Sequence, residues 1–321
     1  MTVPVRSPEL SRPVVPFARD CPPFAPPGYL SARTWAWRSG TCSALNHHFE
    51  VMVEAPLQLQ PLVRALTDPL RAHHHVRSIS RYQIVRRRHD AVPLALYEND
   101  TRLFLSRTPA PLLRYLTWHI NRNAIGKGCA DHVVLHAAAA TRAGITVLLP
   151  GDQEHGKTTT VAGMLRAGYD YVTDEAVALV PHTTGITPFP KALSVDEGSW
   201  HLFPGAIPAG IPQDAHQWQV PAEHFGGRSL HRPLAPPQVI VFPRFVAGAP
   251  TRLLPKTRSE AVRSLVQLTF EFDQHPARNL RTLAAVVRSA TVADLRIGSL
   301  DDAVSAIGWM VSERLLEGMF S

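Results

Sequence analysis

The sequence predicts a mixed α/β (α+β) fold, and three neighbouring features lead to that expectation. Residues 145–149 form a short apolar run with β-branched side chains, as in a buried parallel strand. A turn bounded by Gly151 and Gly156 follows this run, and residues 160–167 carry apolar side chains at helical spacing. Strand, glycine-bounded turn and helix therefore stand in the order that a phosphate-binding loop requires.

The turn has the Walker A pattern Gly-x-x-x-x-Gly-Lys-Thr. In such a loop, consecutive backbone N–H groups and the helix N-terminus point at one anion. Lys157, expected on a solvent-facing loop, adds a positive charge, and the Thr158 hydroxyl is available to Mg²⁺. The sequence thus predicts an ATP site. The expected nucleotide-binding residues are Gly151, Asp152, Gly156, Lys157, Thr158 and Thr159.

The loop pattern has an alternative interpretation, because an ordinary glycine turn with a surface lysine would match it equally well. In addition, Asp152 and Glu154 place two carboxylates close to the expected polyphosphate. They would repel the polyphosphate unless they point away from it.

Composition limits the class of protein. With 321 residues, of which 45% are hydrophobic, the chain can form one large domain or two smaller ones. No apolar run reaches the ~18–20 residues of a membrane span and no signal peptide is indicated, so we expect a cytoplasmic protein without a membrane partner. Cys21, Cys42 and Cys129 are odd in number and widely spaced, which predicts free thiols.

The net charge of +7 arises from 33 Lys and Arg against 26 Asp and Glu. This balance favours an anionic partner, whether nucleotide, acidic peptide or nucleic acid. The densest basic run, residues 86–89, follows a strand-like stretch at residues 82–85. No aromatic ladder accompanies the run, so a solvated strand end is favoured and nucleic acid is disfavoured as a partner.

The N-terminal part divides into an arm and a lobe. Residues 1–30 are expected to form an extended, proline-rich arm, because proline interrupts helices and central strands. Residues 31–130 are expected to form a small α+β lobe. Within it, His73, His74 and His75 predict a loop, since three consecutive side chains point in different directions and make a poor metal site. The predicted strands are residues 48–55, 82–88, 93–99 and 102–106, and the predicted helix is residues 59–66.

Between the lobe and the glycine-bounded turn, two kinds of element are expected. Residues 112–124 carry apolar side chains at helical spacing and predict an amphipathic helix that links the lobe to the core. The apolar runs 133–140 and 145–149 are separated by a short turn that contains glycine. They predict an antiparallel hairpin that leads into the phosphate-binding loop.

An acidic pair, Asp174 and Glu175, lies inside the strand-like segment 171–180. Charges in an apolar strand are costly unless a metal, a cation or a function requires them. We therefore expect the pair to face the triphosphate, with one residue on the metal side and one on the acceptor side. A bulged strand end is the alternative.

In the C-terminal half, Lys191 and Arg244 each follow a proline in a compact segment, and both are expected to contact phosphate or acceptor. The stretch 200–237 between these segments is rich in Pro, Gly and His and predicts a long loop or flap. A strand is expected at residues 239–245. The predicted C-terminal helices span residues 257–268, which open on a capping box, and residues 299–311.

Four motifs, in this order and at this spacing, resemble the C-terminal catalytic domain of HPr serine kinase/phosphorylase and its relatives. They are Leu135-His136-Ala137-Ala138, the loop 151–158, Thr173-Asp174-Glu175 after Gly168, and Pro188-Phe189-Pro190-Lys191. The similarity covers residues 133–307 and implies that residues 131–321 form a nucleotide-binding catalytic domain. It also implies a P-loop core flanked mostly by β-structure and related to that of phosphoenolpyruvate carboxykinase.

The resemblance implies a kinase that uses ATP and Mg²⁺ to phosphorylate a Ser or Thr hydroxyl of a peptide or protein, such as a natural-product precursor peptide. By position, His136 resembles a family histidine near the transferred phosphate. Thr158 and Asp174 are the implied metal ligands, and Glu175 is the implied base toward the acceptor hydroxyl. For His136, a structural role in the core is the alternative.

The chain departs from the family pattern at Gln153-Glu154, where the family has Ser-Gly, and at Glu175, where it has Asp. The segment that phosphorylase-competent members carry after the acidic pair is not evident, so no reverse reaction is predicted. Two alternatives to a kinase stay open, namely a nucleotide-binding regulatory protein with degenerate catalysis and a nucleic-acid-linked NTPase. A homo-oligomer is compatible with the sequence.

Overall fold

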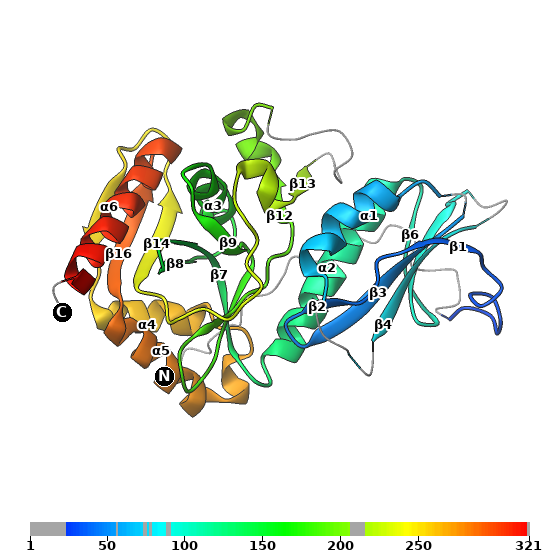
Figure 1. Cartoon of the computed structure of the whole chain (residues 1–321), viewed down its shortest axis with the longest axis horizontal. Coiled ribbons are helices and arrows are strands. Elements are labelled where there is room, and N and C mark those ends of the chain that lie inside the picture. Colours follow the sequence, from blue (N-terminus) through cyan, green and yellow to red (C-terminus); the bar gives the residue numbers. More distant parts are fainter. Residues whose placement is uncertain are drawn as a thin grey trace, which may run out of the picture. The chain divides into compact units, whose positions relative to one another are not determined.

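The computed structural model describes residues 24–55, 57–72, 76, 79–87, 91–205 and 216–319. This part of the chain is a mixed α/β protein, as predicted, and it divides into two compact units (Figure 1). The N-terminal unit comprises the described residues up to Ala124 together with Val195–Pro221. The C-terminal unit comprises Ile125–Ser194 and the described residues from Ala222 onwards.

The division differs from the expected boundary between residues 130 and 131. It falls inside helix α2 (Pro109–Gly128), and it assigns residues 195–221 to the N-terminal unit. The second difference has a local cause, because strand β13 (Gln217–Val220) contacts helix α1 (Gln60–Thr67). The stretch 200–237, predicted as a long loop, thus contains regular structure, while its residues 206–215 lie outside the described chain.

The N-terminal unit contains a six-stranded sheet in the order β1-β3-β4-β5-β6, with β2 beside β3. Only the β3–β4 pair is parallel among its described pairs. Helix α2 packs on this sheet, and the ring of Tyr115 stacks on that of Phe104 with centroids 4.6 Å apart. The strands are β1 (Trp35–Arg38), β2 (Cys42–Ala44), β3 (His47–Glu54), β4 (Ser80–Arg86), β5 (Leu94–Glu98) and β6 (Thr101–Ser106). A separate ribbon pairs β12 (Leu193–Asp196) with β13.

Several expectations for the N-terminal part lie outside the described residues. These are residues 1–23 of the arm predicted at 1–30, Cys21, the three histidines at 73–75 and the end of the basic run at residues 88–89. The other two cysteines, Cys42 and Cys129, are buried free thiols, as predicted. Among the described helices, none combines the length and hydropathy that a membrane crossing requires.

The C-terminal unit is built on an eight-stranded sheet in the order β11-β10-β7-β8-β14-β16-β15, with β9 also paired to β7. Strands β8, β14 and β16 are parallel to one another, whereas β7 and β8 form the predicted antiparallel hairpin. The strands are β7 (Val133–Arg142), β8 (Ile145–Pro150), β9 (Asp170–Thr173), β10 (Ala176–Leu179), β11 (Ile186–Thr187), β14 (Val239–Phe245), β15 (Arg252–Pro255) and β16 (Thr291–Ile297).

Helices cover both faces of this sheet. Helices α4 and α5 bury one face, in a cluster that includes Leu135, Leu148 and Ile240. Val147 and Leu149 of β8 point to the other face and are also buried. On that face helices α3 and α6 contact each other, α3 contacts β7, and α6 contacts β8 and β14. The helices are α3 (Lys157–Arg166), α4 (Arg258–Gln267), α5 (Pro276–Ser289) and α6 (Leu300–Met319).

The predicted strand at residues 171–180 is interrupted at the acidic pair, where β9 ends and β10 begins. On β7, Ala139 pairs with Thr173 and His136 pairs with Ala176. Two residues separate the partners on each strand, so the register is the same before and after the interruption. The irregularity in this pairing lies between Ala139 and Ala140 instead. The acidic pair therefore breaks the hydrogen-bond ladder without adding a residue to it.

The predicted capping box of helix α4 is confirmed. The Thr257 side chain accepts a hydrogen bond from the Glu260 backbone N–H at 3.3 Å, and the Glu260 carboxylate accepts one from the Thr257 N–H at 2.8 Å. Together these bonds pair two of the backbone donors at the start of the helix.

We expect Thr257→Ala to lower the free energy of unfolding by ~1 kcal/mol, because it removes the cap hydroxyl. Thr257→Ser keeps the hydroxyl and serves as the matched control, with stability close to that of the parent chain. Urea unfolding followed by circular dichroism measures both variants. Equal stability of the two would mean that the cap contributes little in this protein.

Candidate active site

The glycine loop, residues 151–156, joins the end of β8 to the start of α3. Gly156 occupies the helix N-cap position with φ of +85°, in the left-handed region that glycine adopts without a Cβ penalty. As a glycine it supplies no side chain that could cap the first backbone N–H groups of α3. The carboxylate residues Asp152 and Glu154 are exposed at the loop surface.

Lys157 is buried, with 6% of its surface exposed, and the expectation of a solvent-facing side chain is wrong. Its ammonium group folds back over the glycine loop and donates to the Asp152 carbonyl at 2.7 Å. Burial lowers the pKa of Lys157, while the carboxylates of Glu175, Asp174 and Asp152 act in the opposite direction. The hydrogen bond to the Asp152 carbonyl therefore holds the lysine against the loop.

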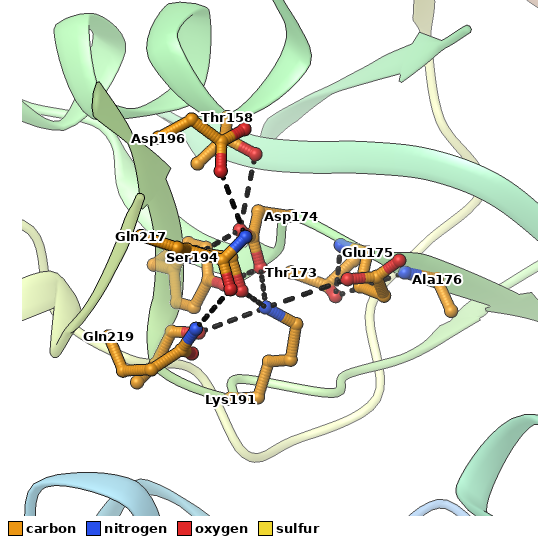
Figure 2. A network of polar contacts seen from close by, with 12 residues as sticks. Thr158, Thr173, Asp174, Glu175, Ala176, Lys191, Ser194, Asp196, Gln217 and Gln219 are labelled. Atoms are coloured by element: carbon orange, nitrogen blue, oxygen red, sulfur yellow. Dashed lines mark hydrogen bonds and ion pairs between the residues drawn. The ribbon is translucent and has the colours of Figure 1, made fainter. Parts of the chain in front are cut away.

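Asp174 has four polar partners in the site (Figure 2). It is 3% exposed, between β9 and β10. Its Oδ2 accepts from the Thr158 hydroxyl at 3.3 Å and from the Ser194 backbone N–H at 3.0 Å. Its Oδ1 accepts from the Tyr171 hydroxyl at 2.8 Å and lies 2.6 Å from the Lys191 ammonium. The buried carboxylate is thus fully paired.

Lys191 has only 2% of its side chain exposed and lies against both carboxylates (Figure 2). Besides Asp174, its ammonium is 3.9 Å from Glu175 Oε2, and it donates to the Ala192 carbonyl and the Ser194 hydroxyl at 2.9 and 3.2 Å. The sequence predicted Lys191 as a phosphate or acceptor contact. The structure places it as the counter-ion of the acidic pair.

Glu175, in the interruption between β9 and β10, lies close to His136 on the neighbouring strand β7. Glu175 keeps 19% of its side chain exposed, and its Oε1 is 4.0 Å from His136 Nε2. Burial lowers the pKa of His136 to about 3, and the charges of Lys157 and His155 act in the same direction. The imidazole is therefore neutral near pH 7, so its approach to Glu175 is not an ion pair.

Arg244 is exposed and lies near the carboxyl end of β14. Its positive charge contributes to the lowered pKa of His155, which places it on the loop side of the sheet. Thr159 lies in the first turn of α3 and is half-buried. Six of the predicted residues come together, namely His136, Lys157, Thr158, Asp174, Glu175 and Lys191.

The oxygens of Thr158 and Asp174 fit a Mg²⁺ site in their spacing and chemistry. Mg²⁺ prefers oxygen ligands at 2.0–2.1 Å in an octahedron, so neighbouring ligands lie about 3 Å apart. The Thr158 hydroxyl and Asp174 Oδ2 are 3.3 Å apart. Within the described residues, no group of three or more His, Cys, Asp or Glu side chains could hold a metal ion. A cation here would therefore depend on phosphate oxygens and water for its other ligands.

Sequence reasoning did not identify Tyr171 and Ser194 as part of the site. Tyr171 is fully buried, and burial raises its pKa well above the usual value, so it is a neutral donor to Asp174. In the sequence it is an aromatic residue in an apolar strand and gives no sign of this role. Ser194 contributes a backbone N–H, which is independent of residue type.

Comparison with known proteins adds no further assignment. No protein-family model matches the chain, and no curated protein matches it.

We expect His136 to make stability depend on pH between its folded pKa of about 3 and its unfolded value of 6.5. In that window the unfolded chain binds the proton that the folded chain excludes, so stability falls as the pH drops, by roughly 1.4 kcal/mol per pH unit well below 6.5. Urea unfolding at pH 7.5 and 5.5 should show a smaller loss for His136→Gln than for the parent. His132 and His155 are present in both proteins and cancel. Equal losses would contradict the buried neutral state of His136.

Proposed function

We propose that this chain is an ATP-dependent phosphotransferase with a P-loop core of the HPr-kinase type, which phosphorylates a Ser or Thr hydroxyl of a peptide or protein. One observation carries the proposal. The Thr158 hydroxyl at the start of α3 lies 3.3 Å from the Asp174 carboxylate, and the partly exposed Glu175 is the next residue. A suitable metal-binding pair and a candidate base thus meet beside a helix N-terminus and a buried lysine.

In this proposal the first turn of α3 and Lys157 bind the phosphates of ATP. Thr158 and Asp174 would hold Mg²⁺, which supplies positive charge that offsets the charge on the phosphate oxygens. Glu175 accepts the proton of the acceptor hydroxyl as its oxygen forms a bond to the γ-phosphorus. The bond from that phosphorus to the bridging oxygen breaks, and ADP leaves. Positioning and charge neutralisation supply most of the rate enhancement.

His136 suits a role beside the base because it is neutral. A neutral imidazole can donate a hydrogen bond to Glu175 or to a phosphate oxygen without a formal charge of its own. Its backbone N–H donates to the Leu268 carbonyl at 2.7 Å, which fixes the strand that carries it. The position of the His136 side chain is therefore set by strand β7 and does not require a bound ligand.

A second candidate function is a nucleotide-binding regulatory protein in which catalysis has degenerated. The position of Lys191 favours it, because one ammonium group lies 2.6 Å from Asp174 and 3.9 Å from Glu175. A cation at this distance competes with Mg²⁺ for Asp174. Such a protein would bind Mg·ATP without transferring phosphate.

Glu175→Gln separates the two functions. If Glu175 is the general base, the variant keeps its affinity for Mg·ATP and loses roughly 10²- to 10⁴-fold in phosphate transfer. Calorimetric titration measures binding, and transfer from labelled ATP to a pool of Ser- and Thr-containing peptides measures catalysis. The matched control is Glu154→Gln, which neutralises an exposed carboxylate of the glycine loop. Transfer at the parent rate by Glu175→Gln would remove Glu175 from the mechanism, and Mg·ATP binding without any transfer by the parent would favour the regulatory protein.

Thr158→Val tests the metal site with little change in side-chain shape. We expect the Mg²⁺ concentration needed for half-maximal ATP binding to rise roughly 10-fold, which corresponds to ~1.4 kcal/mol. Thr158→Ser keeps the hydroxyl and should resemble the parent. Asp174 is a poorer probe, because its removal takes away the nearer of the two carboxylates that pair with the buried Lys191, at a cost of ~3–5 kcal/mol. An unchanged Mg²⁺ requirement in Thr158→Val would show that this hydroxyl is not a ligand.

A further inference from the structure

Strand β14 extends past the end of its parallel neighbour β8 and reaches the glycine loop. Val239 pairs with Val147 and Ile240 with Leu148, so the same register places Phe242 level with Pro150, the last residue of β8. Three more residues of β14 continue beyond that level, about 10 Å at the usual strand rise. These residues still pair with β16 on one side, but on the other side they have passed the end of β8, where the glycine loop begins.

Phe245, the last residue of β14, stands on the same face of the sheet as helix α3. Ile240 and Phe242 belong to the cluster under α4 and α5, and side chains alternate along a strand, so Phe245 belongs to the opposite face. A Cβ placed on Gly156, the N-cap of α3, would lie 3.8 Å from the Cβ of Phe245. The aromatic residue therefore borders the point where the loop enters the helix.

Phe245 is 54% exposed, and the adjoining Val246 is 36% exposed. A large apolar side chain left in water beside a candidate phosphate site is a feature of binding surfaces, because ligand pockets combine aromatic walls with a few polar groups. The base of a nucleotide is joined to its phosphates through the ribose alone, so a surface that borders the phosphate loop is within its reach. Every base has a flat π-face that an aromatic ring can stack on.

We infer that Phe245 is the stacking surface for the base of the nucleotide bound at the glycine loop. This inference rests on the proposed function, since it assumes that the loop binds the phosphates of ATP. Stacking on one face depends on the area of the base and involves few of its polar groups, so it distinguishes poorly between bases of similar size. The site is therefore expected to accept guanine as well as adenine, and to bind pyrimidine nucleotides less tightly because their rings offer less area.

The test compares two ligands that share phosphates and differ in the base. Calorimetric titrations with Mg·ATP and with Mg·tripolyphosphate are made on the full chain and on Phe245→Ala. We expect Phe245→Ala to weaken Mg·ATP by about 5- to 150-fold, the equivalent of ~1–3 kcal/mol for one stacked base, and to leave tripolyphosphate unchanged. Phe245→Tyr should restore the affinity for ATP. The matched control is Leu280→Ala, which removes a 47% exposed side chain from α5, on the other face of the sheet.

The outcomes separate this inference from the proposed function. If the parent binds neither ATP nor tripolyphosphate, the phosphate-loop function fails and the inference fails with it. If the parent binds both ligands and Phe245→Ala binds ATP as the parent does, the inference alone is overturned. An unchanged affinity for ATP with weaker transfer to the peptide pool would assign Phe245 to the acceptor instead. Equal losses for ATP and tripolyphosphate would mean that Phe245 supports the loop and does not contact the base.

Discussion

The candidate site depends on the buried carboxylate of Asp174. Moving such a group out of water costs several kcal/mol even after relaxation, and the fold offsets this cost with a lysine and three hydrogen-bond donors. The donors belong to three separate segments. Thr158 lies at the start of α3, Tyr171 in strand β9 and Ser194 in strand β12. Each segment is therefore fixed relative to Asp174, and the glycine loop, which is continuous with α3, is fixed with them.

The same requirement explains the interruption of the strand. The ladder stops at Asp174, whose side chain contacts the Thr158 hydroxyl of α3 and the Lys191 ammonium. The chain bends at Asp174 and Glu175 and then returns to β7 in the same register. Because the register is unchanged, His136 keeps its place opposite Ala176, beside Glu175. The interruption thus brings an acid, a neutral imidazole and a lysine together at little cost to the sheet.

Features that depend on neighbouring residues could be predicted from the sequence. The β7–β8 hairpin, the glycine loop and the Thr257 capping box each follow from a few adjacent side chains. Lys191 could not be placed in this way, because its partner Asp174 lies seventeen positions away and no periodicity links them. Strand β16 was missed although the burial of its residues alternates. Its weakly apolar sequence, TVADLRI, becomes a strand only through pairing with β14 and β15.

The balance of charge at the site bears on how a nucleotide would be bound. Two ammonium groups, Lys157 and Lys191, face two carboxylates, Asp174 and Glu175, and His136 is neutral. Lys191 is already paired with Asp174, so it has little attraction left for phosphate. In the proposed kinase, the charge of the triphosphate must then be met by Lys157, by the N-terminus of α3 and by a divalent cation. Because the helix end carries only about half an elementary charge, binding of ATP to this site should depend strongly on Mg²⁺, and ATP without the metal should bind poorly.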